Sequence, residues 1–232
     1  MNSHQNPIIE MSHCSKTYRG PAGAVPVLSD CFLSVQAGES VSIIGPSGSG
    51  KSTLLHLIGA LDQPSAGTVM VNGTNIGSLS QKQMTSMRNS VIGFVFQDHF
   101  LLPQCTVMEN VLVPCLGTSA GSATQADYER AERLLRRVGL GERMDHLPGQ
   151  LSGGECQRVA VIRALINKPA VVLADEPTGS LDHDSAVSLV SVLQQLREDE
   201  RITLVMVTHA IEIARTTDRV LALKDGKLEP DR

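Results

Sequence analysis

Nine consecutive residues have the composition of a phosphate-binding loop. They run Gly45-Pro46-Ser47-Gly48-Ser49-Gly50-Lys51-Ser52-Thr53 and fill every fixed position of the pattern G-x-x-x-x-G-K-[ST]. The glycines let successive backbone N–H groups point inward around phosphate oxygens, and a helix beginning near Lys51 adds the positive end of its dipole. Lys51 can reach the β- and γ-phosphates, and the Ser52 hydroxyl can ligate Mg²⁺. A Gly/Ser-rich turn is the alternative, but an apolar strand before the loop and a helical stretch after it favour nucleotide binding.

A pair of acidic residues forms the second candidate site. Asp175 and Glu176 follow the apolar run 170–174, which predicts a buried strand. In a parallel sheet this end and the phosphate loop lie at the same carboxyl edge, where ligands bind. We expect Asp175 to hold Mg²⁺ through water and Glu176 to orient or deprotonate an attacking water.

The third candidate site is the run Leu-Ser-Gly-Gly-Glu-Cys-Gln-Arg-Val at 151–159. Ser152 can cap the helix that follows. Gly153 and Gly154 leave its first N–H groups uncovered, which predicts a second anion site. A plain helix cap or a Schellman turn without a ligand is the structural alternative.

The elements between these sites predict one α/β domain. Apolar strands are expected at 8–18, 27–35, 40–44, 68–71, 91–96, 170–175, 203–207 and 219–223, and a strong hairpin signal, Asn72-Gly73, follows the fourth. Because most of the later strands alternate with helical stretches, we expect a mostly parallel sheet covered on both faces. Helical patterns dominate between roughly Gln97 and Lys168, which predicts a helical lobe inserted into the core.

One helix of this lobe has a clear amphipathic pattern. Between Thr124 and Val138 one face carries Tyr128, Ala131, Leu134, Leu135 and Val138. The charged residues lie largely on the other faces, which we expect to be solvated: Glu129, Arg130, Glu132, Arg133 and Arg137.

Composition bounds the class of protein. The 232 residues are 41% hydrophobic, enough for a substantial core, and the net charge of −4 gives no reason to expect nucleic-acid binding. The five cysteines form no C-x-x-C pair and are interpreted as thiols of a reducing compartment. We find neither a membrane-spanning apolar run nor a secretory signal, so a cytosolic chain is expected.

The three sites in this order make the chain resemble ABC-type ATPases, whose signature is L-S-G-G-E-x-Q-R, here residues 151–158. The resemblance covers nearly the whole chain. It implies an α/β P-loop NTPase fold with a RecA-like, mostly parallel core sheet and an antiparallel β subdomain. An ABC-specific helical subdomain is inserted into that core. We therefore expect one nucleotide-binding domain over 1–232, with the core at 1–96 and 169–232 and the helical subdomain at 97–168.

The resemblance also implies roles for individual residues. Two copies would sandwich two ATP molecules with Mg²⁺, so that Ser152–Gly154 of one copy contact the γ-phosphate on the other copy's loop. Gln97 would sense Mg²⁺ and the attacking water, and His209 would contact the γ-phosphate. Asp182, in the run Ser180-Leu181-Asp182, would couple the two sites, and Tyr18 would stack on adenine. The implied catalytic residues are Lys51, Gln97, Glu176 and His209, and the implied metal-binding residues are Ser52, Gln97 and Asp175.

Five segments resemble more narrowly the lipoprotein-releasing and macrolide-exporting ATPases: residues 54–67, 93–97, 101–103, 109–111 and 174–182. That group implies a separate four-helix permease with a large extracytoplasmic domain. The ATPase would then be peripheral at the cytoplasmic face of the inner or plasma membrane. Residues 98–115 would form the groove for the permease, although Phe100, Leu101 and Leu102 fit a plain lobe core equally well.

Departures from the usual pattern limit this narrower resemblance, and two alternative functions stay open. Asp98-His99 and the stretch 105–115 depart from the usual lipoprotein-releasing pattern, so the cargo is not carried over. An importer ATPase remains an alternative, although the regulatory extension of many importers is not seen. A soluble ABC ATPase acting on DNA or ribosomes is a second alternative, but its usual coiled-coil insertion, C-x-x-C pairs and second ATPase domain are not seen.

Overall fold

The computed structural model describes residues 6–20, 23–117 and 121–231. Its central element is a six-stranded sheet in the order β10-β9-β3-β8-β7-β6. β6, β7, β8, β3 and β9 run parallel, and β10 pairs antiparallel with β9. The strands are β3 (Ser40–Ile44), β6 (Ile92–Val95), β7 (Val171–Asp175), β8 (Thr203–Val207), β9 (Arg219–Lys224) and β10 (Lys227–Pro230). The mostly parallel core sheet that the sequence predicts is therefore confirmed.

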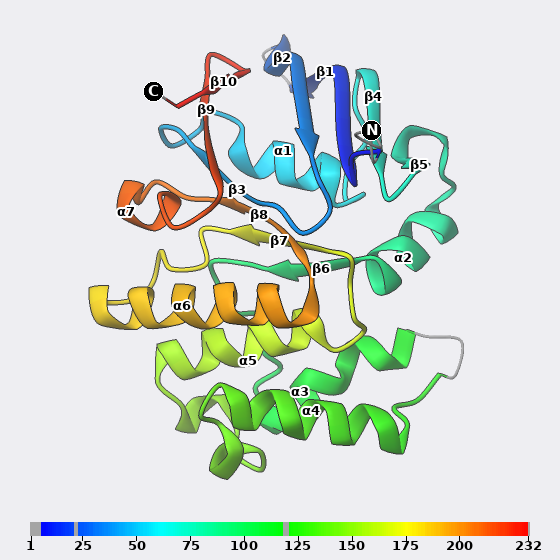
Figure 1. Cartoon of the computed structure of the whole chain (residues 1–232). Helices are drawn as coiled ribbons and strands as arrows, with labels where there is room; N and C mark the ends of the chain where they lie inside the picture. The colour runs from blue at the N-terminus through cyan, green and yellow to red at the C-terminus, as the bar shows by residue number, and fades with distance from the viewer. Residues whose placement is uncertain (1–5, 21–22, 118–120, 232) are drawn as a thin grey trace, which may run out of the picture.

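A second sheet is antiparallel, with the order β2-β1-β4-β5, and lies at the top of Figure 1. Its strands are β1 (Ile9–Gly20), β2 (Gly23–Val35), β4 (Ala66–Val71) and β5 (Thr74–Asn75). Asn72 and Gly73 connect β4 to β5 with φ angles of 47° and 73°, and positive φ at both central residues is the geometry of a type I′ hairpin turn. The hairpin predicted at this dipeptide is confirmed.

Helices cover both faces of the six-stranded sheet (Figure 1). The α-helices are α1 (Lys51–Ile58), α2 (Gln81–Ser90), α3 (Val107–Leu112), α4 (Gln125–Arg137), α5 (Gly153–Leu165), α6 (His183–Glu200) and α7 (Ile211–Ala214). Short 3₁₀ helices occupy Ile76–Ser78, Val113–Gly117, Gly141–Arg143 and Pro148–Gln150. Capping boxes fix several helix starts because a side chain satisfies N–H groups that have no partner inside the helix; they begin at Ser80, Thr106, Thr124 and Ser152.

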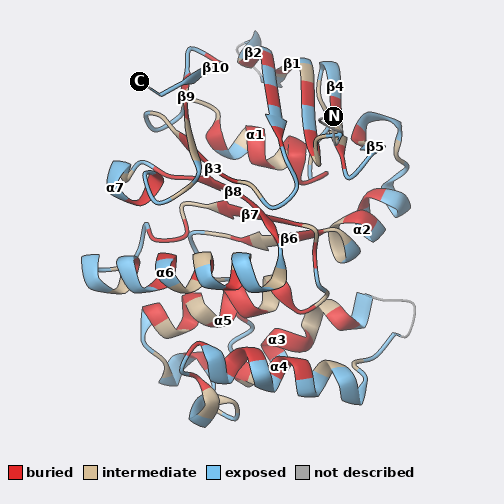
Figure 2. Cartoon of the chain, in the orientation of Figure 1, coloured by how far each residue is buried: buried red, intermediate tan, exposed pale blue. Residues whose placement is uncertain are grey.

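Alternating side chains of the central strands belong to two different hydrophobic cores. On β7, Val171 and Leu173 belong to the core that also contains α1 and the antiparallel sheet. Val172 and Ala174 belong to the core formed by α3, α4, α5 and α6. Figure 2 shows the resulting continuous buried strip through the middle of the molecule. Because both faces of these strands are covered, their sequences are continuously apolar instead of alternating.

The helix α4 corrects one expectation. Arg130 is buried, with only 9% of its surface exposed, whereas Tyr128 is 46% exposed. The Arg130 guanidinium donates to the carbonyl oxygens of Leu165 and Ile166 at the end of α5, and to Glu200 of α6 at 2.7 Å. The prediction of a solvated charged face was wrong at this position because Arg130 turns inward and binds carbonyl oxygens at the end of a helix.

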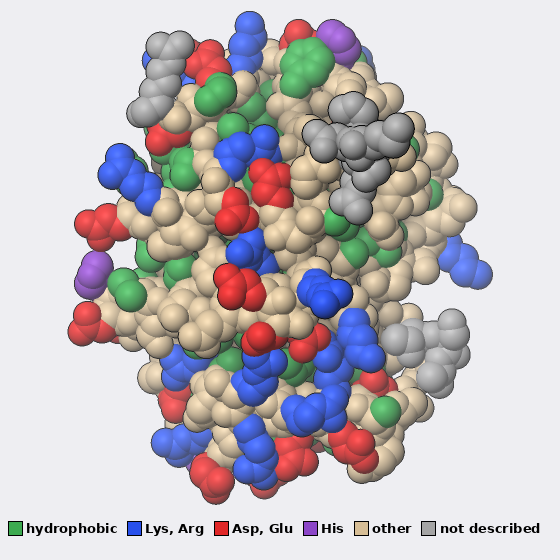
Figure 3. Space-filling view, in the orientation of Figure 1, with side chains coloured by type: hydrophobic (Ala, Val, Ile, Leu, Met, Phe, Trp, Pro, Cys, Tyr) green, Lys and Arg blue, Asp and Glu red, His purple; other side chains and the backbone are tan. Residues whose placement is uncertain are grey.

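The charged surface, the cysteines and the hydropathy of the helices can be compared with what the composition predicts. On the face drawn in Figure 3, acidic and basic side chains lie interspersed over the lower helices. All five cysteines lie in the described residues and carry thiols rather than disulfides. Burial raises the pKa of Cys14 and of Cys115 to about 11, so both thiols are protonated at neutral pH. Within the described ranges, no helix combines the length and the apolar character needed to cross a membrane.

Candidate functional site

The loop after β3 has the backbone geometry of an anion cradle. Gly48 and Gly50 have φ angles of 77° and 102°, in the left-handed region that glycine adopts at little cost. Gly50 is also the N-cap of α1, and no side chain caps this helix. The first N–H groups of α1 are therefore available to an anion, and its first turn holds no acidic residue that would repel one.

Lys51 lies at the start of α1 with its ammonium group turned onto the loop. Its Nζ donates to the carbonyl oxygens of Gly45 at 2.9 Å and Pro46 at 3.1 Å, and lies 3.9 Å from Oε1 of Glu176. The Lys51 side chain is 8% exposed. A positive charge is thus held, nearly desolvated, between the phosphate loop and the acidic pair.

The phosphate loop and the acidic pair open into one cavity of about 690 Å³. Both lie at the carboxyl edge of the sheet because β3 and β7 are parallel strands flanking β8. The cavity is lined by Val27, Ser47, Gly48, Gly50, Lys51, Ser52, Thr53, Phe96, Gln97, Asp98, Phe100, Asp175, Glu176 and His209. The structure therefore brings together the predicted loop, acids, glutamine and histidine from four separate segments of the chain.

Asp175 is the last residue of β7 and contacts the phosphate loop. Burial raises the pKa of its carboxyl group, and a hydrogen bond with the Ser52 hydroxyl opposes that rise only in part. Asp175, Ser52 and the amide oxygen of Gln97 are hard oxygen donors of the kind that Mg²⁺ prefers. The residues present therefore fit a magnesium ion bound with a phosphate ligand.

Glu176 has a backbone conformation unusual for a side-chain-bearing residue, with φ at 47°. Its N–H donates to the Val207 carbonyl of β8 at 2.9 Å, which holds this conformation in place. Its Oε2 accepts from the backbone N–H of His209 at 3.2 Å and lies 2.9 Å from His209 Nδ1. The carboxylate is 15% exposed and the imidazole 70%, so the histidine presents its ring to solvent at the mouth of the cavity.

The segment around Gln97 is anchored by α5. Gln157 donates to the Phe96 carbonyl at 2.7 Å, and Arg163 donates to the His99 and Phe100 carbonyls at 2.6 and 2.8 Å. Because α5 begins at the Ser152 cap, one helix carries both the glycine pair at 153–154 and the anchors of the Gln97 segment.

Ser152, Gly153 and Gly154 do not line the cavity that holds the phosphate loop. Ser152 caps α5 in a box with Glu155, so the predicted cap is confirmed. A Cβ atom built on Gly153 would lie 3.7 Å from Leu181, and one on Gly154 would lie 3.5 Å from Ser185. The glycine pair thus packs against the start of α6, away from its own chain's phosphate loop.

Tyr18 and Asp182 also lie outside the cavity lining. Asp182 is the N-cap of α6 and accepts from the N–H of Ser185 at 2.9 Å and from its hydroxyl at 2.7 Å. These bonds lower the pKa of the Asp182 carboxyl. Tyr18, on β1, is 40% exposed and donates its phenol to Asp62 at 2.8 Å.

Comparison with known proteins assigns the family. The family model described as "ABC transporter" matches residues 28–179. The chain belongs to the ABC transporter family.

Individual relatives of this ABC chain cover it almost completely. It is 45% identical over 227 residues to "Lipoprotein-releasing system ATP-binding protein LolD 2" of Caulobacter vibrioides, covering 98% of this chain and 99% of that protein. It is 44% identical to "Macrolide export ATP-binding/permease protein MacB" of Rhodopirellula baltica, covering 97% of this chain but 33% of that protein. A dimeric, post-hydrolysis structure of the ATP-binding cassette MJ0796 bound to ADP and Pi matches with a TM-score of 0.86 at 39% identity, over 97% of this chain and 99% of that one. The predicted ABC ATPase fold is confirmed.

Several cavity residues of this ABC chain are not predicted by the motifs. Phe96 and Asp98 flank Gln97, so the position of that glutamine could have indicated them. Phe100 is 63% exposed and Leu102 is 39% exposed, whereas Leu101 is buried in the core formed by α3, α4, α5 and α6. Val27 reaches the cavity from β2, in the antiparallel sheet, and no local pattern points to it.

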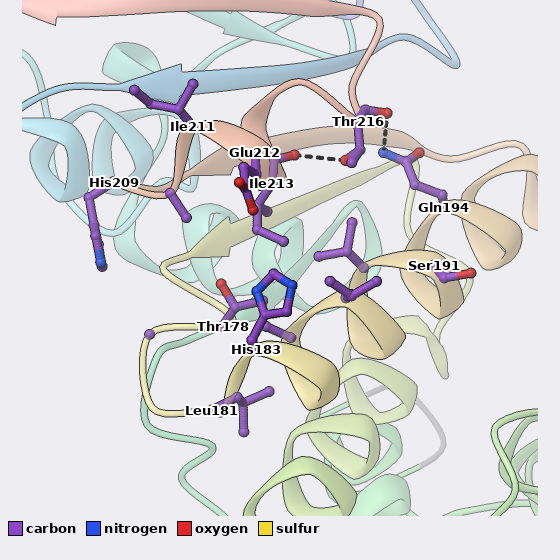
Figure 4. A pocket seen from close by; sticks show the side chains of 15 residues that line it. Thr178, Leu181, His183, Ser191, Gln194, His209, Ile211, Glu212, Ile213 and Thr216 are labelled. Atoms are coloured by element: carbon purple, nitrogen blue, oxygen red, sulfur yellow. Dashed lines mark hydrogen bonds between the residues drawn. The ribbon is translucent and has the colours of Figure 1, made fainter.

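A second cavity, of about 650 Å³, lies between α6 and α7 and shares His209 with the first. Figure 4 shows the His183 ring among its lining side chains, with Gln194 donating to the Thr216 carbonyl at 3.2 Å. Its described lining contains neither Lys nor Arg. The cavity at the phosphate loop differs in that Lys51 lines it.

Proposed function

We propose that this chain is the ATP-hydrolysing subunit of an ABC transporter and powers a separate permease of the lipoprotein-releasing or macrolide-exporting type. The convergence of phosphate loop, acidic pair, Gln97 and His209 on one cavity carries the ATPase proposal. The match to the lipoprotein-releasing relative supports the assignment to that subfamily and to a separate permease. This chain spans 99% of that ATP-binding protein but only 33% of the macrolide ATP-binding/permease protein.

The residues 45–53 bind the phosphates of ATP. Backbone N–H groups of the loop and of the first turn of α1 surround the phosphate oxygens. Lys51 exchanges its bonds to the Gly45 and Pro46 carbonyls for the β- and γ-phosphates. This exchange is favourable because a charged phosphate oxygen is a stronger acceptor than a neutral carbonyl.

Glu176 and His209 act on the water that attacks the γ-phosphate. The Glu176 carboxylate orients that water and accepts its proton, and Gln97 contacts it from the opposite lobe. Oxygen of water forms the new bond to phosphorus, and the bond from phosphorus to the bridging oxygen of ADP breaks. His209, held by its hydrogen bonds to Glu176, donates to the γ-phosphate where negative charge develops.

Ser52, Asp175 and Gln97 would hold Mg²⁺. Bound there, the ion would neutralise phosphate charge and fix the geometry of the β- and γ-phosphates. Ser52, Gln97 and Asp175 all line the same cavity. Burial raises the pKa of Asp175, and its ionised form is the one that binds metal.

Two copies of the chain complete each site. Ser152, Gly153 and Gly154 lie away from the cavity of their own chain. The first N–H groups of α5, at Gly153 and Gly154, suit the γ-phosphate bound by the partner copy. Asp182, at the start of α6, packs beside this glycine pair and couples the two sites. Tyr18 stacks on adenine.

The chain divides into two parts around these sites. The core is formed by 1–96 and 169–232, and the helical subdomain by 97–168.

The helical subdomain docks the permease. Phe100 and Leu102 are exposed and lie close to Gln97 in the chain. An apolar permease segment bound to them would be displaced when Gln97 moves. A four-helix permease with a large extracytoplasmic domain fits the narrower resemblance. The subunit is then peripheral at the cytoplasmic face of the membrane, and ATP-driven closure of the dimer moves the permease.

Purification of the Glu176→Gln chain with ATP from detergent-solubilised native membranes tests this proposal. The substitution keeps ATP bound because the phosphate loop is unchanged, so the complex is trapped with its partner. We expect mass spectrometry to identify a four-helix permease with a large outer domain. The same purification without ATP is the control for non-specific capture.

Two other outcomes correct the proposal. A five- or six-helix permease with a soluble binding protein would make the chain an importer ATPase. Ribosomal or DNA-bound material would remove the transport function and leave only the ATPase.

A further inference from the structure

The proposed adenine platform, Tyr18, is held by the carboxylate of Asp62, to which the sequence motifs assign no role. The Tyr18 phenol donates to Asp62 Oδ2 at 2.8 Å, and the Lys16 ammonium donates to Asp62 Oδ1 at 2.6 Å. Lys16 also donates to the Gln63 carbonyl at 2.8 Å. One carboxylate therefore fixes two side chains of β1 at once.

Lys16 covers the Tyr18 ring. The two residues are two positions apart on β1, so their side chains share a face of the strand. The Lys16 Nζ lies 4.8 Å from the ring centroid, a cation–π distance. Lys16 is 9% exposed and Tyr18 is 40% exposed. The cation is thus buried against the ring while much of the ring stays open to solvent.

Asp62 is tied to the helix that binds phosphate. Its N–H donates to the His56 carbonyl of α1 at 3.2 Å, and that of Leu61 does so at 2.9 Å. Thr53, in the first turn of α1, lies near the Tyr18 phenol, since it opposes part of the burial-driven rise in the pKa of that phenol. The ring of Tyr18 is therefore fixed relative to the same helix whose N-terminus forms the phosphate site.

The negative charge of the Asp62 carboxylate is balanced by the Lys16 ammonium and stabilised by the Tyr18 phenol. Burial alone would raise the pKa of Asp62, but the hydrogen bonds from Lys16 and Tyr18 outweigh it and lower that pKa. Asp62 is therefore ionised at neutral pH and remains an acceptor for both donors.

We propose that Asp62 is a positioning residue for nucleotide binding, which holds the Tyr18 ring at the distance from the phosphate loop that an adenine base requires. This inference rests on the proposed role of Tyr18 as the adenine platform. Lys16 backs the ring from one side, and the base stacks on the part of the ring that is exposed. Asp62 touches neither base nor phosphate and acts only through Tyr18.

Calorimetric titration of the full chain with ADP and with inorganic tripolyphosphate tests this inference. Stacking of one aromatic ring accounts for an affinity change of about 5- to 10-fold. We therefore expect Asp62→Ala and Tyr18→Ala each to weaken ADP binding about 5- to 10-fold. Tripolyphosphate has no base, so its affinity stays within about twofold and also reports that the phosphate site is folded.

The double variant separates positioning from independent effects. Because Asp62 acts through Tyr18, the pair Asp62→Ala and Tyr18→Ala together should bind ADP no more weakly than Tyr18→Ala alone, within about twofold. Tyr18→Phe keeps the ring and removes the phenol that donates to Asp62, so it should reproduce part of the Asp62→Ala effect. Asp30→Ala, an exposed carboxylate of the same sheet paired with His13, is the matched control and should bind ADP normally.

Each contrary result identifies what has failed. If Asp62→Ala weakens tripolyphosphate and ADP equally, or if its effect adds fully to that of Tyr18→Ala, Asp62 does not position the base. If Tyr18→Ala leaves ADP affinity unchanged, the proposed platform itself is wrong.

Discussion

The polar side chains of the ATP cavity form hydrogen bonds with one another and with the phosphate loop. Glu176 accepts two hydrogen bonds from His209 and lies 3.9 Å from the Lys51 ammonium. Lys51 in turn satisfies two carbonyls of its own loop. Binding of ATP therefore requires the side chains of Lys51 and His209 to exchange hydrogen-bond partners within a site that is already assembled. Little reorganisation is then needed at the moment of reaction, which is the condition for strong electrostatic catalysis.

At this scale, His209→Ala should lower kcat while leaving ATP affinity nearly unchanged. The ring is 70% exposed, so its loss should cost little stability, but the developing charge on the γ-phosphate loses a donor. Loss of such a donor lowers kcat by about 10²- to 10³-fold. Steady-state phosphate release measures kcat, and His183→Ala, which lines only the neighbouring cavity, is the control. Equal losses in both variants would remove His209 from its proposed role.

At the scale of elements, the approach of β6 to α5 is set by a residue without a side chain. A Cβ atom on Gly93 would lie 2.3 Å from the Ala164 carbonyl oxygen, a backbone atom that cannot move aside alone. Gly93→Ala should therefore lower the free energy of unfolding by about 1–3 kcal/mol. Urea denaturation measures this change.

The control for this prediction is Gly149→Ala, where an added Cβ meets nothing within 4 Å. It should change the free energy of unfolding by less than about 0.5 kcal/mol. If both glycines tolerate alanine equally, the contact between β6 and α5 is not limiting.

A carboxylate joins β9 to β3 and α6. Asp218 accepts from the N–H of Ser40 at 2.8 Å, from its hydroxyl at 2.9 Å and from Arg197 at 2.7 Å. Burial alone would raise the pKa of Asp218, but these bonds lower it below its ordinary value of 3.8. A carboxylate with a lowered pKa stabilises the fold fully above its ordinary pKa and loses that contribution as the pH falls through the folded value.

Asp218→Asn should therefore reduce stability at about pH 6 and converge on the parent protein as the pH falls below about 4. Urea unfolding at several pH values measures the difference in the free energy of unfolding. Asp145→Asn, an exposed position, should show no such convergence. A constant difference between parent and Asp218→Asn at all pH values would mean that ionisation of Asp218 does not contribute.

At the scale of the whole molecule, the sequence predicts those features of the fold and the site that depend on a few adjacent residues. The strand–loop–helix order around Lys51 and the apolar run before Asp175 place both at the carboxyl edge of a parallel sheet, and the structure has them in one cavity. The capping pattern at Ser152 likewise predicts the start of α5. These features are local, so a few adjacent residues determine them.

Contacts between distant segments could not be predicted in this way. Arg130 and Glu200 pair across 70 positions, and Lys16 and Asp62 across 46. Periodicity indicates which face of α4 carries charge. Only the packed structure shows that Arg130 on that face binds the carbonyl oxygens of Leu165 and Ile166. The left-handed backbone of Glu176 is similarly set by the β8 strand beside it.

The central claim is that each ATP site is completed by the second copy of the chain. The direct measurement is the mass in solution, with ATP, of the Glu176→Gln chain and of the same chain carrying Ser152→Arg. We predict that Glu176→Gln sediments at twice the 24.8 kDa of one chain. Addition of Ser152→Arg should leave a monomer that still binds ATP, because its phosphate loop is intact, whereas Ser86→Arg on α2 should leave the dimer. A Ser152→Arg chain that still dimerises, or that loses ATP binding and dimerisation together, would contradict a site shared between two copies.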